Sequence, residues 1–139
     1  MKSSEKMKSD KFLVDTTIWI KFLRGLDVSL KEHVSSLVLE DRAFTSEIII
    51  LEILRGAKSD KEYNMLYQDF LALPQLPVDV GVWETAWKTA YKLRKSGLNA
   101  PMADVVISSI ALHNKCTLLH ADKHFNLIAK HTELKAVEG

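Results

Sequence analysis

FLVDTTIWI, residues 12–20, joins a short apolar run to the start of an amphipathic helix, with one aspartate between them. Residues 12–14 fit a buried strand, and the residues from Thr16 onward carry the apolar spacing of a helix. Asp15 therefore stands where a strand ends and a helix begins. In open α/β sheets with parallel strands, ligands bind at this edge.

The alternation of short strands and helices continues along the rest of the chain. Apolar runs typical of strands lie at residues 11–14, 42–45, 75–78, 117–119 and 134–137. Apolar residues at helical spacing fill residues 16–24, 29–40, 47–57, 60–71, 79–96, 101–113 and 122–129. Strands that alternate with helices favour a parallel sheet covered on both faces. The sequence therefore predicts an α/β fold: a three-layer α/β/α domain with a short-stranded, mostly parallel central sheet.

The chain of 139 residues has the length of one domain. Residues 1–10 are polar and rich in Lys and Ser, so we expect a flexible extension there and a single domain over residues 11–139. The formal net charge is only +1, which excludes a strong overall field for nucleic acid. A polyanionic partner would need a local basic patch.

The expected location follows from cysteine content and hydropathy. Cys116 is the only cysteine, so no disulfide can form within the chain, and a reducing compartment is favoured. No apolar stretch reaches the ~18 residues needed to span a bilayer. The basic N-terminus is not followed by an apolar segment before Phe12, which argues against a signal peptide. We therefore expect a cytoplasmic protein without a membrane segment.

Four of the 18 acidic residues stand in apolar surroundings, namely Asp15, Glu52, Asp104 and Asp122. An unpaired carboxylate in such company is costly, so each needs a cation, a basic side chain or backbone N–H groups. Two of the four follow predicted strands. The other two lie on helices whose N-termini should open on the same edge of the sheet. The pattern predicts a cluster of carboxylates at that edge.

Each acid also has a purely structural alternative. Asp15 and Asp122 could be N-caps of the helices that follow them, each stabilising its helix by ~1 kcal/mol. Asp104, near a helix start, could complement the helix dipole. Glu52, in the middle of a helix, could pair with Arg55 one turn later. These alternatives stay open at the level of sequence.

A cluster of four carboxylates offers only oxygen ligands, which select Mg²⁺ or Mn²⁺ over zinc. The five histidines are scattered and the single cysteine has no partner, so no zinc motif competes. A divalent ion at such a site lowers the pKa of bound water, and the resulting hydroxide can attack phosphorus in line. The acids thus point to hydrolysis of phosphodiester bonds.

Four motifs, in order along the chain, resemble those of the PIN-domain ribonucleases, specifically the VapC-type toxins of type II toxin–antitoxin systems. They are VDTTIWI at residues 14–20, TS and LEILRGA at 45–46 and 51–57, ADVVISSIAL at 103–112, and LLHADKHF at 118–125. The resemblance spans roughly residues 11–137, almost the whole chain. It implies a PIN-like fold.

The resemblance also implies an activity, that of an endoribonuclease dependent on Mg²⁺ or Mn²⁺. The catalytic acids carried over by position are Asp15, Glu52, Asp104 and Asp122. The implied metal ligands are Asp15, Asp104 and Asp122, and the hydroxyls that would support them belong to Thr16 and Thr17. No other cofactor is implied.

One residue departs from the family pattern. The fourth motif usually has Thr or Ser at the position where this chain has His120. The hydroxyl contact expected there is therefore replaced by an imidazole. Two roles stay open for His120: contact with the substrate, or filling of the interior.

The resemblance further implies three partners: an RNA substrate, a cognate antitoxin protein, and a second copy of the chain in a homodimer. The tryptophans Trp19, Trp83 and Trp87 fall on predicted helix faces, where packing in the core or in a dimer is favoured over base stacking.

Two other classes of protein compete with this interpretation. The alternative is a non-catalytic PIN-like module that binds RNA or protein, although the presence of all four acids argues against loss of activity. A phosphatase with Asp15 as covalent nucleophile would want a second aspartate two residues later, where this chain has Thr17.

Overall fold

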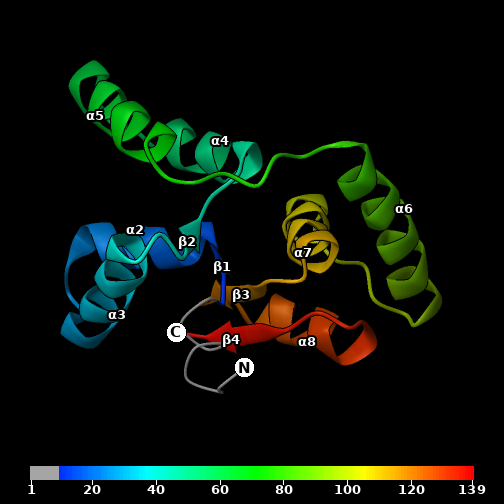
Figure 1. Cartoon of the computed structure of the whole chain (residues 1–139). Coiled ribbons are helices and arrows are strands. Elements are labelled where there is room, and N and C mark those ends of the chain that lie inside the picture. Colours follow the sequence, from blue (N-terminus) through cyan, green and yellow to red (C-terminus); the bar gives the residue numbers. More distant parts are fainter. Residues whose placement is uncertain (1–9) are drawn as a thin grey trace.

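A parallel sheet of four short strands organises the molecule. The computed structural model describes residues 10–139, in which the strand order is β2-β1-β3-β4 (Figure 1). The strands are β1 (Phe12–Val14), β2 (Ala43–Phe44), β3 (Thr117–His120) and β4 (Ala136–Glu138). Each pairs in parallel with its neighbour. All four carboxyl ends therefore lie at one edge of the sheet.

Seven helices of the described residues surround this sheet. They are α2 (Thr16–Arg24), α3 (Val28–Leu39), α4 (Glu47–Arg55), α5 (Asp60–Leu71), α6 (Val80–Lys95), α7 (Met102–Asn114) and α8 (Lys123–His131). In Figure 1, α2 and α3 lie on one side of the sheet and α6, α7 and α8 on the other, while α4 and α5 extend from its upper end. None of the helices within residues 10–139 has the length and apolar character needed to cross a lipid bilayer. The predicted α/β fold with a mostly parallel sheet is confirmed.

The core lies where the helices cover the two central strands. Leu13 and Val14 of β1 and Leu118 and Leu119 of β3 are almost completely buried. Such unbroken apolar runs are typical of strands covered on both faces. Each buried leucine stabilises the fold by about 1.5–3 kcal/mol relative to an exposed one. The sheet that carries the site is therefore held firmly by its own strands.

One predicted strand is wrong. Residues 75–78 form only an isolated bridge between Gln75 and Thr45. Pro74 precedes this segment and Pro77 interrupts it, and proline has no N–H to give to a sheet. The other predicted boundaries differ from the observed ones by at most two residues. The extension predicted for residues 1–10 lies outside the described residues except for Asp10.

The central strand β1 is the point where the chain changes direction across the sheet. β2 lies on one side of β1 and β3 on the other, and ligands of such sheets bind outside the strand ends at this point. The backbone N–H of Asp15 donates to the carbonyl of Leu119 at 2.9 Å, and that of Ala121 donates to Oγ1 of Thr17 at 3.0 Å. These bonds hold Asp15 and Asp122 on adjacent strand ends.

Candidate active site

Asp15 leaves the end of β1 and caps the N-terminus of α2. Its Oδ2 accepts hydrogen bonds from the backbone N–H of Thr17 at 3.1 Å and from Oγ1 of Thr17 at 2.5 Å. Asp15 is only 3% exposed. This burial raises the pKa of its carboxyl group, whereas the hydrogen bonds from Thr17 lower it. The capping alternative is therefore confirmed.

Glu52 reaches the same region from α4, which packs against both α2 and α7. Its Oε1 accepts a hydrogen bond from Oγ1 of Thr16 at 2.6 Å. The predicted alternative, an ion pair with Arg55, is absent from residues 10–139 and was wrong. Arg55 is exposed instead. The negative charge of Glu52 also contributes to the raised pKa of Asp15.

Asp104 lies in the first turn of α7, and its side chain is 15% exposed. Burial and the negative charges of Asp122, Asp15 and Glu52 raise its pKa to about 6, against a smaller opposing effect of His124. Within residues 10–139 its carboxylate receives no hydrogen bond from a backbone N–H group. The negative charges of the other three predicted acids thus all act on Asp104.

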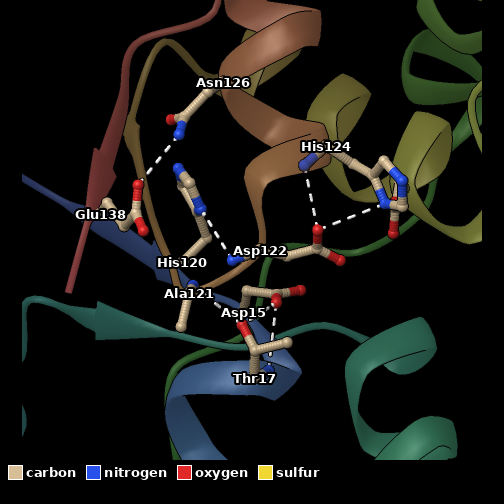
Figure 2. A network of polar contacts seen from close by, with 9 residues as sticks. Asp15, Thr17, His120, Ala121, Asp122, His124, Asn126 and Glu138 are labelled. Atoms are coloured by element: carbon tan, nitrogen blue, oxygen red, sulfur yellow. Dashed lines mark hydrogen bonds and ion pairs between the residues drawn. The ribbon is translucent and has the colours of Figure 1, made fainter.

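Asp122 follows β3 and caps α8. Its Oδ1 accepts a hydrogen bond from the backbone N–H of His124 at 2.9 Å, so the capping alternative is confirmed here too (Figure 2). Nδ1 of His124 lies 3.2 Å from the same Oδ1 and 3.6 Å from Oδ2 of Asp104. One potential ligand atom from each of Asp104, Asp122 and His124 lies within 4.8 Å of the other two.

His124 is the residue that the sequence analysis missed. A signal for it was available, because a histidine two positions after a capping aspartate lies in the first turn of the same helix. Its imidazole could therefore have been expected to turn back toward the strand end.

His120 is completely buried, which excludes substrate contact in this conformation and leaves the interior role. Its Nδ1 accepts a hydrogen bond from the backbone N–H of Asp122 at 3.2 Å (Figure 2). The centre of its ring lies 5.2 Å from that of the Phe125 ring. Burial lowers the pKa of His120, which favours the neutral ring that this bond requires. The imidazole of His120 therefore accepts the hydrogen bond that a Thr or Ser hydroxyl at the same position would accept. This bond stabilises the turn of the chain at Asp122.

The donor set of this cluster fits a divalent cation. Asp104 has acids around it, and its pKa is raised to about 6. Among the described residues, His124 is the one basic side chain recorded beside it that could balance its negative charge. Carboxylate oxygens are the ligands that Mg²⁺ and Mn²⁺ take, and a bound cation would remove the repulsion among them.

The fold and the acidic cluster define the class of protein. Residues 12–131 match the PIN domain family, and the chain belongs to that family. Within it, the chain is 30% identical to Ribonuclease VapC11 of Mycobacterium tuberculosis over 128 residues, which cover 89% of this chain and 96% of that protein.

Two solved structures show the same fold at low sequence identity. DNA-bound VapBC from Salmonella typhimurium superimposes with a TM-score of 0.80 at 16% identity, covering 93% of this chain and 98% of that one. VapBC-5 from Mycobacterium tuberculosis, a member of the VapBC family of toxin-antitoxin systems, gives a TM-score of 0.67 at 16% identity, with the same coverage of 93% and 98%.

Proposed function

We propose that this protein is a metal-dependent endoribonuclease that hydrolyses RNA phosphodiester bonds and acts as a toxin. The observation that carries the proposal is the convergence of Asp15, Glu52, Asp104 and Asp122 at the carboxyl edge of a parallel sheet. Burial and then the negative charges of the other three acids raise the pKa of Asp104. The ribonuclease name of the relative at 30% identity supports the choice of RNA as substrate.

In this mechanism Asp15, Asp104 and Asp122 would hold the ion through carboxylate oxygens, with Thr17 fixing the orientation of Asp15. A bound Mg²⁺ or Mn²⁺ ion supplies a water molecule of lowered pKa and positive charge beside the phosphate. Glu52, whose Oε1 accepts a hydrogen bond from Oγ1 of Thr16, would orient the attacking water and accept a proton from it. No described residue is required as a covalent nucleophile.

The proposal predicts cleavage of RNA that depends entirely on a divalent ion. We expect the purified chain to cut a mixture of structured RNAs with Mg²⁺ or Mn²⁺ present, and to stop when the ion is chelated. The Asp15→Asn variant should be inactive under the same conditions, because it loses a ligand charge. The measurement is gel analysis of RNA fragments over time. Cleavage that persists with chelator or in the Asp15→Asn variant would instead indicate a contaminating nuclease, or the alternative of a non-catalytic PIN-like module. No observation favours that alternative.

We propose in addition that a cognate antitoxin protein silences this activity. The support is the fold shared with VapBC-5, a member of the VapBC family of toxin-antitoxin systems. A cytoplasmic location would suit an RNA substrate and the single, buried Cys116.

We also propose a homodimer in which α6 contributes to the interface. Trp19 lies in the core against Phe70, which is one of the two kinds of packing predicted for the tryptophans. Trp83 and Trp87 are 43% and 65% exposed, and Tyr91, one turn further along α6, is 65% exposed. A row of exposed aromatic side chains on one helix is typical of a protein interface.

Replacing Trp87 with glutamate should convert the dimer to a monomer. A charge in the centre of an apolar interface is desolvated without a partner, which opposes association. Light scattering after size-exclusion chromatography measures the mass directly. Lys88→Glu is the matched control, since Lys88 is the exposed neighbour of Trp87 and lies off the aromatic row. A dimer that survives Trp87→Glu would place the interface elsewhere.

A further inference from the structure

We propose that His124 is a metal ligand, and that its nitrogen makes the site prefer transition-metal ions such as Mn²⁺ over Mg²⁺. The proposal deepens the proposed function and rests on it, because it concerns the same carboxylate cluster. What is new is a nitrogen donor in a site that the sequence predicted to hold oxygen donors alone.

The distances from the imidazole nitrogen of His124 to the two carboxylates are close to those between neighbouring ligands of one ion. Ligand atoms at about 2.1 Å from an octahedral ion lie about 3.0 Å apart when adjacent and about 4.2 Å apart when opposite. Nδ1 of His124 lies 3.2 Å from Oδ1 of Asp122 and 3.6 Å from Oδ2 of Asp104. The three residues offer donor atoms within 4.8 Å of one another. The imidazole therefore occupies a position next to both carboxylates, as an adjacent ligand does.

The backbone holds this arrangement in place. Asp122 is the N-cap of α8, and the N–H group of His124 donates to its Oδ1 at 2.9 Å. The backbone N–H group and the imidazole of His124 thus both lie against the carboxylate of Asp122. The side chains of Asp122 and His124 are therefore positioned together (Figure 2). The imidazole is 56% exposed, which leaves it open to an ion arriving from solvent, whereas the Asp104 side chain is 15% exposed.

Donor chemistry sets the expected preference. Mg²⁺ takes oxygen ligands and keeps several bound water molecules, whereas divalent ions of the first-row transition metals also accept imidazole nitrogen. A nitrogen donor beside two carboxylates therefore adds affinity for Mn²⁺ and little for Mg²⁺. The competing explanation is that protonated His124 is only a counter-charge for the acids, in which case an arriving ion must displace it.

Pulsed electron paramagnetic resonance of Mn²⁺ bound to the full chain separates the two roles. We expect the wild-type spectrum to contain the coupling of Mn²⁺ to a directly bound ¹⁴N nucleus, and His124→Asn to lack it. The dissociation constant of Mn²⁺, measured by titration, should rise at least about 10-fold in this variant. That of Mg²⁺ should change much less. His131→Asn is the matched control, because His131 is an exposed histidine on the same helix, α8.

Each other outcome overturns a defined part of the argument. Mn²⁺ binding without nitrogen coupling, or tighter binding of both ions by His124→Asn, would show that His124 is a displaced counter-charge and not a ligand. Failure of the wild-type chain to bind Mn²⁺ at all would overturn the proposed metal site together with this inference. Coupling that survives His124→Asn would assign the nitrogen to a different residue.

Discussion

Asp104→Asn is expected to lower RNA cleavage by more than about 100-fold, since even the residues that support a metal ligand contribute 10- to 100-fold. The same substitution should raise the thermal stability of the metal-free protein. Asp104 is the acid on which the repulsion of Asp122, Asp15 and Glu52 converges, and its pKa is raised to about 6. At pH 8 the folded protein must keep this carboxylate ionised, and the neutral amide removes that requirement.

The gain in stability should be on the order of 3 kcal/mol, because the pKa rises from 3.8 to about 6 and one pKa unit corresponds to about 1.4 kcal/mol. For a chain of this length that is a rise of roughly 8–15 °C in Tm. Calorimetry in the presence of chelator gives the stability, and fragment analysis of a defined RNA gives the activity. Glu133→Gln removes one exposed negative charge outside the cluster and should change neither. An inactive Asp104→Asn variant that is also less stable would mean that the carboxylate has a structural partner.

The opposite signs of these two effects distinguish a functional cluster from a structural one. If a carboxylate stabilised the fold through a structural partner, its neutralisation would lower both the activity and the stability of the protein. Asp15 and Asp122 have such partners, since both accept backbone N–H groups as helix caps. Asp104 accepts no backbone N–H group among the described residues, and the imidazole of His124 is the one basic group recorded beside it there. The cost of its ionised form to the fold is therefore a sign of a cation site.

The two strand-end acids could be predicted from sequence because their positions follow from local patterns. Asp15 and Asp122 each come directly after an apolar run and before a helical one, and parallel strands bring such positions to one edge. The order of the strands, which places β1 beside β3, is not encoded in any local pattern. The resemblance to the PIN-domain family implied a PIN-like fold, and no strand order was predicted from the residues themselves.

The contacts between distant segments were beyond local reasoning. Glu52 was given Arg55 as its alternative partner because a helix brings neighbours one turn apart together. Its actual partner is Thr16, 36 residues away, through the packing of α4 on α2. His120 could not be assigned from sequence because its role depends on complete burial, which only the assembled fold provides.

Binding of a divalent ion should stabilise the wild-type protein strongly, and more at pH 8 than at pH 5. At an ion concentration of 100 times Kd, linkage gives about 2.7 kcal/mol, or a rise of roughly 8–14 °C in Tm. The pH dependence follows because protons and the ion compete for the same carboxylates. Calorimetry with and without Mn²⁺ at both pH values measures the effect. A shift in Tm that is equal at pH 5 and pH 8, or no shift at all, would contradict binding by these acids.

The metal-free protein should show the complementary pH dependence. An acid whose pKa is raised on folding contributes stability that is fully present below its unfolded pKa and is lost as the pH rises through its folded pKa. For Asp104 these values are 3.8 and about 6, and Asp15 acts in the same direction. The difference in Tm between Asp104→Asn and wild type isolates this contribution from all other titrating groups. It should be small at pH 4, grow between pH 4 and 6, and stay constant above about pH 7. A difference that shrinks as the pH rises would mean that folding favours the ionised form of Asp104, and the electrostatic case for a cation at this cluster would then fail.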